Sequence, residues 1–143
     1  MTGAVLLDTH IALWLDSGSD KLRRPTLDLI ENCWRDGGTI YLSAVSAWEI
    51  ALLVDGDRIS LDLPVDAWVQ RFISRPGIKA APLDVRAASR AYRIPGLEHR
   101  DPADRLLIAT AIELGCPLIT YDDRISRFSQ KHGRELSFSI QAE

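Results

Sequence analysis

Residues 99–122 read HRDPADRLLIATAIELGCPLITYD. Asp101 is a favoured residue for capping a helix, and Asp104 follows three positions later, in the first turn, where a carboxylate meets the positive end of the helix dipole. The stretch from 102 to 115 is apolar on nearly every face and predicts a buried helix. Residues 116–122 then predict a buried strand that ends in an acid. Helix and strand in direct succession are typical of an α/β protein.

The rest of the chain repeats this alternation. Short apolar strands are predicted at 5–8, 39–43, 77–83, 116–122 and 136–140, and helices at 10–15, 22–38, 46–56, 63–74, 84–92, 102–115 and 124–133. Uniformly apolar strands between helices favour a parallel sheet with helices on both faces. No internal repeat or linker is visible, so we expect one domain over residues 1–143.

Composition excludes several classes of protein. The apolar runs are too short for a transmembrane helix, and the N-terminus lacks the pattern of a signal peptide, so we expect a cytoplasmic protein without membrane contact. The net charge of −3 does not indicate a nucleic-acid binder, although a local basic surface is sufficient for binding. Cys33 and Cys116 show no metal-binding spacing and are expected to be buried free thiols.

Four acids are expected at one edge of this sheet. Asp8 and Asp122 each follow a strand, so they share its carboxyl edge, and Glu49 begins the helix that leaves the same edge. Asp104 joins them if the N-terminus of its helix lies over that edge. Each acid also has a local explanation: Asp8 and Asp122 are placed to cap helices, and Ser46 with Glu49 forms the S-x-x-E pattern of a capping box.

Convergence of these acids would have chemical consequences. Close carboxylates cannot all remain ionised without a compensating charge, so their pKa values would rise. A divalent cation supplies that charge. Because the candidate ligands are carboxylate oxygens, and His10, His99 and His132 are scattered, the pattern indicates Mg²⁺ or Mn²⁺ and argues against zinc.

Four motifs in order, LLDT (6–9), SAWEI (46–50), HRDPADRLLIATA (99–111) and LITYD (118–122), resemble the PIN-domain family, in particular the VapC-type ribonuclease toxins of toxin–antitoxin pairs. The resemblance covers nearly the whole chain. It implies a three-layer α/β/α domain with a central parallel sheet, metal-dependent endoribonuclease activity on RNA, a homodimer, and inhibition by a small antitoxin protein.

The resemblance also implies roles for individual residues. The catalytic acids would be Asp8, Glu49, Asp104 and Asp122. The metal ligands would be Asp8, Asp104 and Asp122, with Glu49 completing the shell or orienting water. Asp101 and Thr120 would support the site. Since water is the nucleophile, we expect products with 5′-phosphate and 3′-hydroxyl ends.

Other features have two interpretations each. Arg100, Arg105 and Arg124 flank the acids and would bind substrate phosphates or pair with the carboxylates. The basic stretch 21–24 would touch RNA or, more simply, begin a solvated helix. Tryptophans show helical spacing, and core packing is the expectation for Trp34 and Trp48. Trp14 and Trp68 are better candidates for a protein-binding surface, although core packing is still preferred for them.

Two other classes of α/β phosphoryl-transfer protein require acidic residues that this sequence does not have at the expected positions. A haloacid-dehalogenase-type phosphatase needs a second aspartate two residues after Asp8, where His10 stands. A response-regulator receiver needs an acidic pair near the N-terminus and a phospho-acceptor after the third strand, for which PLD (82–84) is a poor match. A non-catalytic module that binds RNA or protein and keeps the fold remains open, and the complete acid set argues against it.

Overall fold

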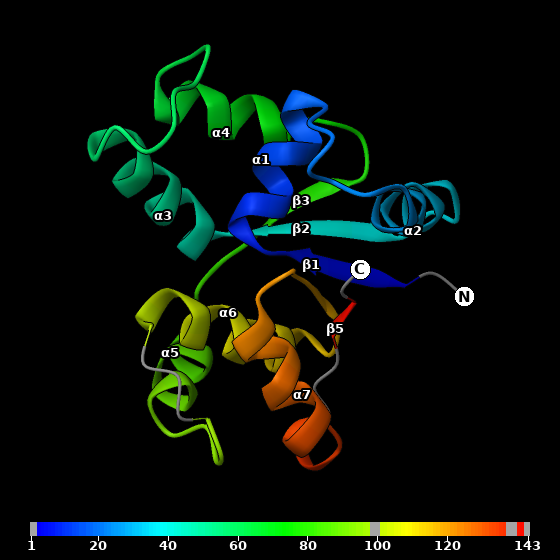
Figure 1. The fold of residues 1–143 in the computed structure, drawn as a ribbon, viewed down its shortest axis with the longest axis vertical. Helices are drawn as coiled ribbons and strands as arrows, with labels where there is room; N and C mark the ends of the chain where they lie inside the picture. The colour runs from blue at the N-terminus through cyan, green and yellow to red at the C-terminus, as the bar shows by residue number, and fades with distance from the viewer. Residues whose placement is uncertain (1–2, 98–100, 137–139, 142–143) are drawn as a thin grey trace.

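A parallel five-stranded sheet forms the centre of the molecule (Figure 1). The structure, a computed structural model, describes residues 3–97, 101–136 and 140–141. The strands are ordered β3-β2-β1-β4-β5. Their bounds are β1 Ala4–Leu7, β2 Thr39–Ser43, β3 Ile78–Ala81, β4 Leu118–Ile119 and β5 Ile140–Gln141. The predicted parallel sheet is confirmed, with β4 and β5 shorter than the apolar runs that predicted them.

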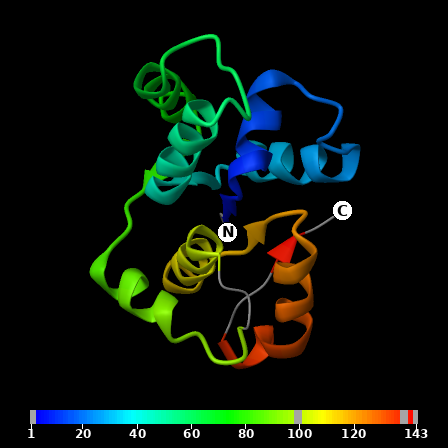
Figure 2. The same ribbon diagram turned by 60° about the vertical axis from the view of Figure 1, so that its left-hand side comes forward.

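Helices cover both faces of the sheet, as Figures 1 and 2 show. One layer contains α1 (Thr9–Ser17), α2 (Arg24–Arg35), α3 (Ala44–Asp55) and α4 (Val65–Ile73). The opposite layer contains α5 (Val85–Tyr92), α6 (Pro102–Leu114) and α7 (Asp123–Leu136). The predicted three-layer α/β/α architecture is therefore confirmed. Within the described ranges, no helix is long and apolar enough to cross a bilayer.

Alternation of side chains along β1 explains why this strand is apolar throughout. Val5 and Leu7 pack into the core under α1–α4, whereas Leu6 packs into the core under α5–α7. Strand β4 repeats the arrangement, with Leu118 in the second core and Ile119 in the first. Because both faces are buried, a polar residue in either strand would lie in a core, which is why the sequence shows continuous apolar runs.

The strand order reverses between β1 and β4. From β1 the chain proceeds outward through β2 and β3, and it then returns to place β4 on the other side of β1. At the carboxyl end of this pair, the backbone N–H of Asp8 donates to the carbonyl of Ile119 over 2.9 Å. Such a switch point is where open α/β sheets bind their ligands.

The tryptophan predictions were partly wrong. Trp34 and Trp48 are 49% and 55% exposed, so the expected core packing fails for both. Trp34 instead covers Gly77, whose φ of +83° and missing side chain leave room for the indole ring. Trp68 is 1% exposed and stacks on Phe72, as the core alternative required.

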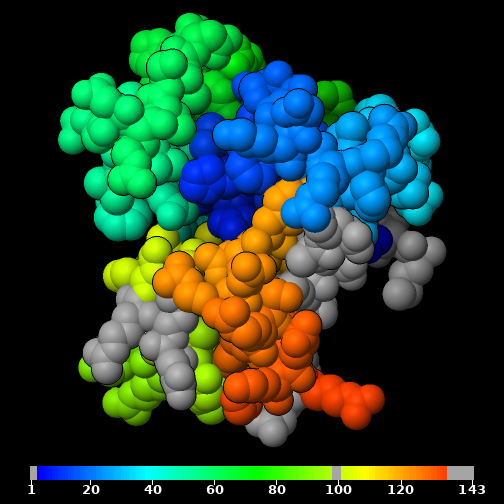
Figure 3. All heavy atoms as spheres, viewed as in Figure 1, coloured from blue at the N-terminus to red at the C-terminus, as the bar shows by residue number. Residues whose placement is uncertain are grey.

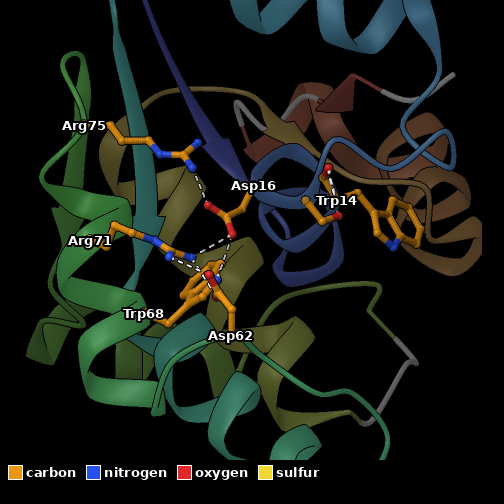
Figure 4. Close-up of polar contacts among 7 residues, drawn as sticks. Trp14, Asp16, Asp62, Trp68, Arg71 and Arg75 are labelled. Atoms are coloured by element: carbon orange, nitrogen blue, oxygen red, sulfur yellow. Dashed lines mark hydrogen bonds and ion pairs between the residues drawn. The ribbon is translucent and has the colours of Figure 1, made fainter.

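A partly buried carboxylate ties α1 to α4 (Figure 4). Asp16, near the end of α1, accepts a 2.9 Å hydrogen bond from the indole Nε1 of Trp68 and ion pairs from Arg71 and Arg75. Arg71 also pairs with Asp62 at 2.7 Å. The network satisfies the indole N–H of Trp68 in the core and fixes the position of α1, whose first residue follows Asp8.

The cysteine prediction holds for one residue only. Cys116 is a buried free thiol, and burial raises its pKa to about 11. Cys33 is also a free thiol, but it lies on α2 near the sheet edge and is only partly buried. Neither is placed to act as a nucleophile, since a raised pKa keeps the thiol protonated.

Candidate active site

Asp8 lies at the switch point, directly after β1. It caps α1, because its Oδ1 accepts the backbone N–H of Thr9 over 2.7 Å. Its Oδ2 accepts the Thr120 hydroxyl over 2.6 Å. Burial raises the pKa of the Asp8 carboxyl, and the charge of Asp122 adds to the rise, although both hydrogen bonds oppose it. An acid of this kind is poised to accept a cation.

Glu49 is linked to Asp8 through Thr9, whose backbone N–H donates to Asp8. The Thr9 hydroxyl donates to Oε1 of Glu49 and lies 2.9 Å from the Ser46 hydroxyl, with which it shares a second hydrogen bond. Burial raises the pKa of Glu49, and the charges of Asp8 and Asp101 raise it further. These interactions place Glu49 within electrostatic reach of both aspartates.

The predicted capping box is wrong. Helix α3 begins at Ala44, two residues earlier than expected, and its cap is Ser43, whose hydroxyl accepts the N–H of Val45 over 3.0 Å. Ser46 and Glu49 consequently lie inside the helix, where no backbone N–H needs them. Their side chains are directed to Thr9 instead, so helix capping does not explain Glu49.

Asp122 and Asp8 are linked through Thr120. The Thr120 hydroxyl donates to Asp8 and accepts the backbone N–H of Asp122 over 3.0 Å. Asp122 in turn caps α7, since its Oδ1 accepts the N–H groups of Arg124 and Ile125 at 2.8 and 3.1 Å. The predicted cap at Asp122 is therefore confirmed, and its second oxygen lies 3.5 Å from the Arg124 guanidinium.

Helix α6 brings Asp104 to the same edge. Asp101 caps this helix by accepting the N–H of Ala103 over 3.0 Å, as predicted. Asp104 lies in the first turn and is only 7% exposed. One guanidinium nitrogen of Arg124 lies 4.0 Å from Asp104 and 3.5 Å from Asp122, which places the two carboxylates on either side of a single cation. The condition set by the sequence, that the helix begins over this edge, is met.

The three candidate arginines differ in position. Arg124 bridges the acids, which is the ion-pairing alternative. Arg105 donates to the carbonyls of Ala91 and Leu97 at 2.9 and 2.8 Å and so supports the segment that follows α5. Arg100 lies outside the described residues.

The donor chemistry of the site fits a hard divalent cation, because every candidate ligand is a carboxylate or hydroxyl oxygen. Within the part of the chain that the structure describes, no three acidic, histidine or cysteine side chains close around a common point. Thr9, Thr120 and Arg124 instead occupy the spaces between the carboxylates and provide protons and one positive charge.

Two residues of the site were missed by sequence reasoning. Thr9 and Ser46 are fully buried polar side chains. Thr9 links the two acids, because its backbone N–H donates to Asp8 and its hydroxyl donates to Glu49, and Ser46 contacts the Thr9 hydroxyl. The available signal was Thr9 itself, a hydroxyl residue placed directly after a candidate ligand and ahead of a helix.

A pocket of about 550 Å³ lies between α3 and the start of α6. Glu49 and Asp101 belong to its wall, together with the exposed Trp48 and Arg58. A ligand larger than water that occupied this pocket would contact Glu49 and Asp101.

Comparison with known proteins gives concordant results. The PIN-domain family model matches residues 5–131. Ribonuclease VapC22 of Mycobacterium tuberculosis (strain ATCC 25618 / H37Rv) is 33% identical over 133 residues, which cover 93% of this chain and 96% of that protein. The crystal structure of VapBC2 from Rickettsia felis bound to a promoter DNA fragment matches with a TM-score of 0.65 at 16% identity, covering 97% of this chain and 98% of that one. A toxin–antitoxin complex from Klebsiella pneumoniae matches with a TM-score of 0.59 at 16% identity, covering 94% of each chain. The two structural matches show a shared fold.

Proposed function

The chain belongs to the PIN-domain family, and we propose that it is a metal-dependent endoribonuclease that hydrolyses RNA phosphodiester bonds at Asp8, Glu49, Asp104 and Asp122. The observation that carries this proposal is the linkage of the four acids at one sheet edge, through Thr9, Thr120 and Arg124. The proposal is also supported by the 33% identity of this chain to a ribonuclease, over almost the full length of both chains. This complete acid set argues against a non-catalytic binding module.

Asp8, Asp104 and Asp122 would hold Mg²⁺ or Mn²⁺. A divalent cation at such a site lowers the pKa of a coordinated water and stabilises negative charge on a phosphate. A metal ion would bind the ionised form of Asp8, and because burial raises the pKa of this carboxyl, metal binding should strengthen as pH rises. Thr120 keeps one oxygen of Asp8 oriented by its hydrogen bond and thereby fixes the direction of the other.

Glu49 is suited to orient water or accept its proton. Burial raises the pKa of Glu49, which is the direction of shift that favours a general base, and the Thr9 hydroxyl fixes its Oε1. The second oxygen remains available to a water at the pocket wall, to which Glu49 contributes. Since water attacks the phosphate, the 2′-hydroxyl of RNA takes no part, and the products carry 5′-phosphate and 3′-hydroxyl ends.

The proposal includes two protein partners. One is a small antitoxin, supported by the ribonuclease VapC22 relative and by the toxin–antitoxin complexes among the structural matches. The other is a second copy of the chain. Apolar side chains suited to such an interface are exposed on α3 and α5, among them Leu52 at 50% and both Val85 and Tyr92 at 84%.

Expression of the wild-type chain alone should arrest the growth of a bacterial host, because uninhibited cleavage of cellular RNA would stop protein synthesis. Asp8→Asn should be harmless at equal expression, since the substitution keeps the cap of α1 but removes a metal-binding charge. Growth curves with matched immunoblots measure both, and co-expression of a small antitoxin encoded beside the gene should restore growth. Equal growth of wild type and Asp8→Asn strains would remove the support for a toxin.

A further inference from the structure

Aromatic and cationic side chains gather beside the carboxylates, and the chemistry proposed above uses none of them. The group comprises His10 and Trp14 of α1, Lys21 and Arg23 of the segment between α1 and α2, and Tyr121, which lies between Thr120 and Asp122. We refer to these five residues as the aromatic–basic surface. Figure 3 shows α1, the start of α2 and the segment around residue 121 adjoining on one face of the molecule.

The rings form a continuous row. Ring centroids of His10 and Trp14 are 5.7 Å apart, and those of Trp14 and Tyr121 are 5.9 Å apart. Cations lie over two of these rings: Nζ of Lys21 is 6.0 Å from the centre of Trp14, and Cζ of Arg23 is 4.2 Å from the centre of Tyr121. These distances are those of cation–π contacts.

Tyr121 is fixed in place by its hydroxyl. It donates to Oγ1 of the buried Thr26 over 2.6 Å and accepts the backbone N–H of Arg23 over 3.1 Å. The segment that carries Asp122 is thereby tied to the start of α2. The aromatic–basic surface is consequently a preformed feature with a set position relative to the carboxylates.

The two cations retain their charge for a ligand. Both are exposed, and among the described residues neither Lys21 nor Arg23 forms an ion pair with a carboxylate. Arg24, by contrast, pairs with Asp28 at 3.0 Å, and Arg124 pairs with the site acids. In a chain with a net charge of −3, this is a local positive region beside the active site.

One end of the surface opens into a pocket. His10 and Trp14 line a cavity of about 610 Å³ between α1 and α4. On its far wall, Asp16 and Asp62 are neutralised by Arg71 and Arg75, and in Figure 4 the ring of Trp14 points away from that network. The pocket therefore offers space and an aromatic wall, with its acidic groups already paired.

We propose that the aromatic–basic surface binds single-stranded RNA next to the phosphate that is cleaved, with bases stacking on His10 and Trp14 and phosphates contacting Lys21 and Arg23. This inference rests on the proposed function. Stacking rings combined with cations are the general means of binding single-stranded nucleic acid. An acidic peptide would use the cations but would gain little from a row of rings, so RNA is the better fit.

The test is an RNA-binding measurement with a matched pair of charge variants. In the Asp8→Asn background, Arg23→Gln and Arg24→Gln each remove one positive charge from neighbouring positions, but only Arg23 lies over Tyr121. The Kd is measured by fluorescence anisotropy with a labelled RNA. A length of about 12 nucleotides lies within the range that such surfaces cover. We expect the Kd to rise about 5-fold or more for Arg23→Gln, and the slope of log K against log salt to fall by about 0.7. Arg24→Gln should stay within about 2-fold, because its charge is already paired.

A second variant examines stacking. Trp14→Leu keeps the apolar contact with the core and removes the ring, and we expect at least about 5-fold weaker RNA binding. Cleavage of the same RNA by the wild type distinguishes a failure of this inference from a failure of the proposed function. If RNA is cleaved but Arg23→Gln and Arg24→Gln have equal Kd values and salt slopes, this inference is overturned and the proposed function stands. If Arg23→Gln weakens only antitoxin binding, the surface is a protein interface and the inference is likewise overturned. If RNA is neither bound nor cleaved, the proposed function fails.

Discussion

Asp104→Asn should abolish detectable RNA cleavage in a protein that still folds, whereas Asp101→Asn should remain active. Asp104 is buried in the first turn of α6 and faces Arg124 and Asp122. Asp104 is one of the three proposed metal ligands. We expect the loss of its charge to decrease kcat by at least about 100-fold, the size of effect seen when one electrostatic group of an active site is deleted. Asp101 mainly caps the helix, and Asn caps about as well as Asp.

Removing the helix cap at Asp101 should lower the stability of the protein more than it lowers cleavage. Asp101→Ala loses the hydrogen bond to the N–H of Ala103 and should lower the free energy of unfolding by about 1 kcal/mol. Cleavage kinetics and thermal melts of the three variants measure both effects. An inactive Asp101→Asn together with an active Asp104→Asn would show that the two roles are assigned the wrong way round.

Millimolar Mg²⁺ or Mn²⁺ should raise the melting temperature of the wild type and leave Asp8→Asn nearly unchanged. A ligand that binds only the folded state at 100 times its Kd adds about 2.7 kcal/mol, which for a chain of this size corresponds to roughly 5–10 °C. Differential scanning fluorimetry with and without chelator measures the shift. Equal shifts in both proteins would remove the basis for a carboxylate metal site.

The pH dependence of stability follows from the raised pKa values of Asp8 and Glu49. A raised folded-state pKa means that the stabilising contribution is fully present below the unfolded-state pKa and is lost as pH rises through the folded-state pKa. In chelator, the wild type should therefore lose stability relative to Asp8→Asn as pH rises. Metal affinity should increase over the same range, because binding displaces protons from these carboxyls.

The sequence predicted the order of the elements and the edge at which the acids meet. Both follow from strong local signals: β1 and β4 are apolar on two faces, and Asp8 and Asp122 follow them directly. A parallel sheet then brings strand ends together without any knowledge of side-chain contacts. The start of α6 was equally predictable, since Asp101 and Pro102 act through local backbone preferences.

The errors arose where tertiary packing decides the outcome. The pattern of Ser46 and Glu49 fits a capping box, yet Ser43 caps the helix and leaves both side chains for Thr9. Trp48 has helical spacing suited to a core but faces outward, whereas Trp68 packs on Phe72 in the core with its N–H donated to Asp16. Partners so distant in sequence are invisible to a local pattern.

The chemistry of the RNA ends distinguishes metal-dependent hydrolysis by water from attack by the 2′-hydroxyl. Purified wild-type protein and Asp8→Asn would be incubated with an end-labelled RNA in Mg²⁺ or in chelator, and the products mapped with enzymes that distinguish 5′-phosphate from 5′-hydroxyl ends. Hydrolysis by water at the carboxylate edge predicts 5′-phosphate and 3′-hydroxyl products that require both the metal and Asp8. Cleavage that persists in chelator and leaves 5′-hydroxyl and 2′,3′-cyclic phosphate ends would contradict it.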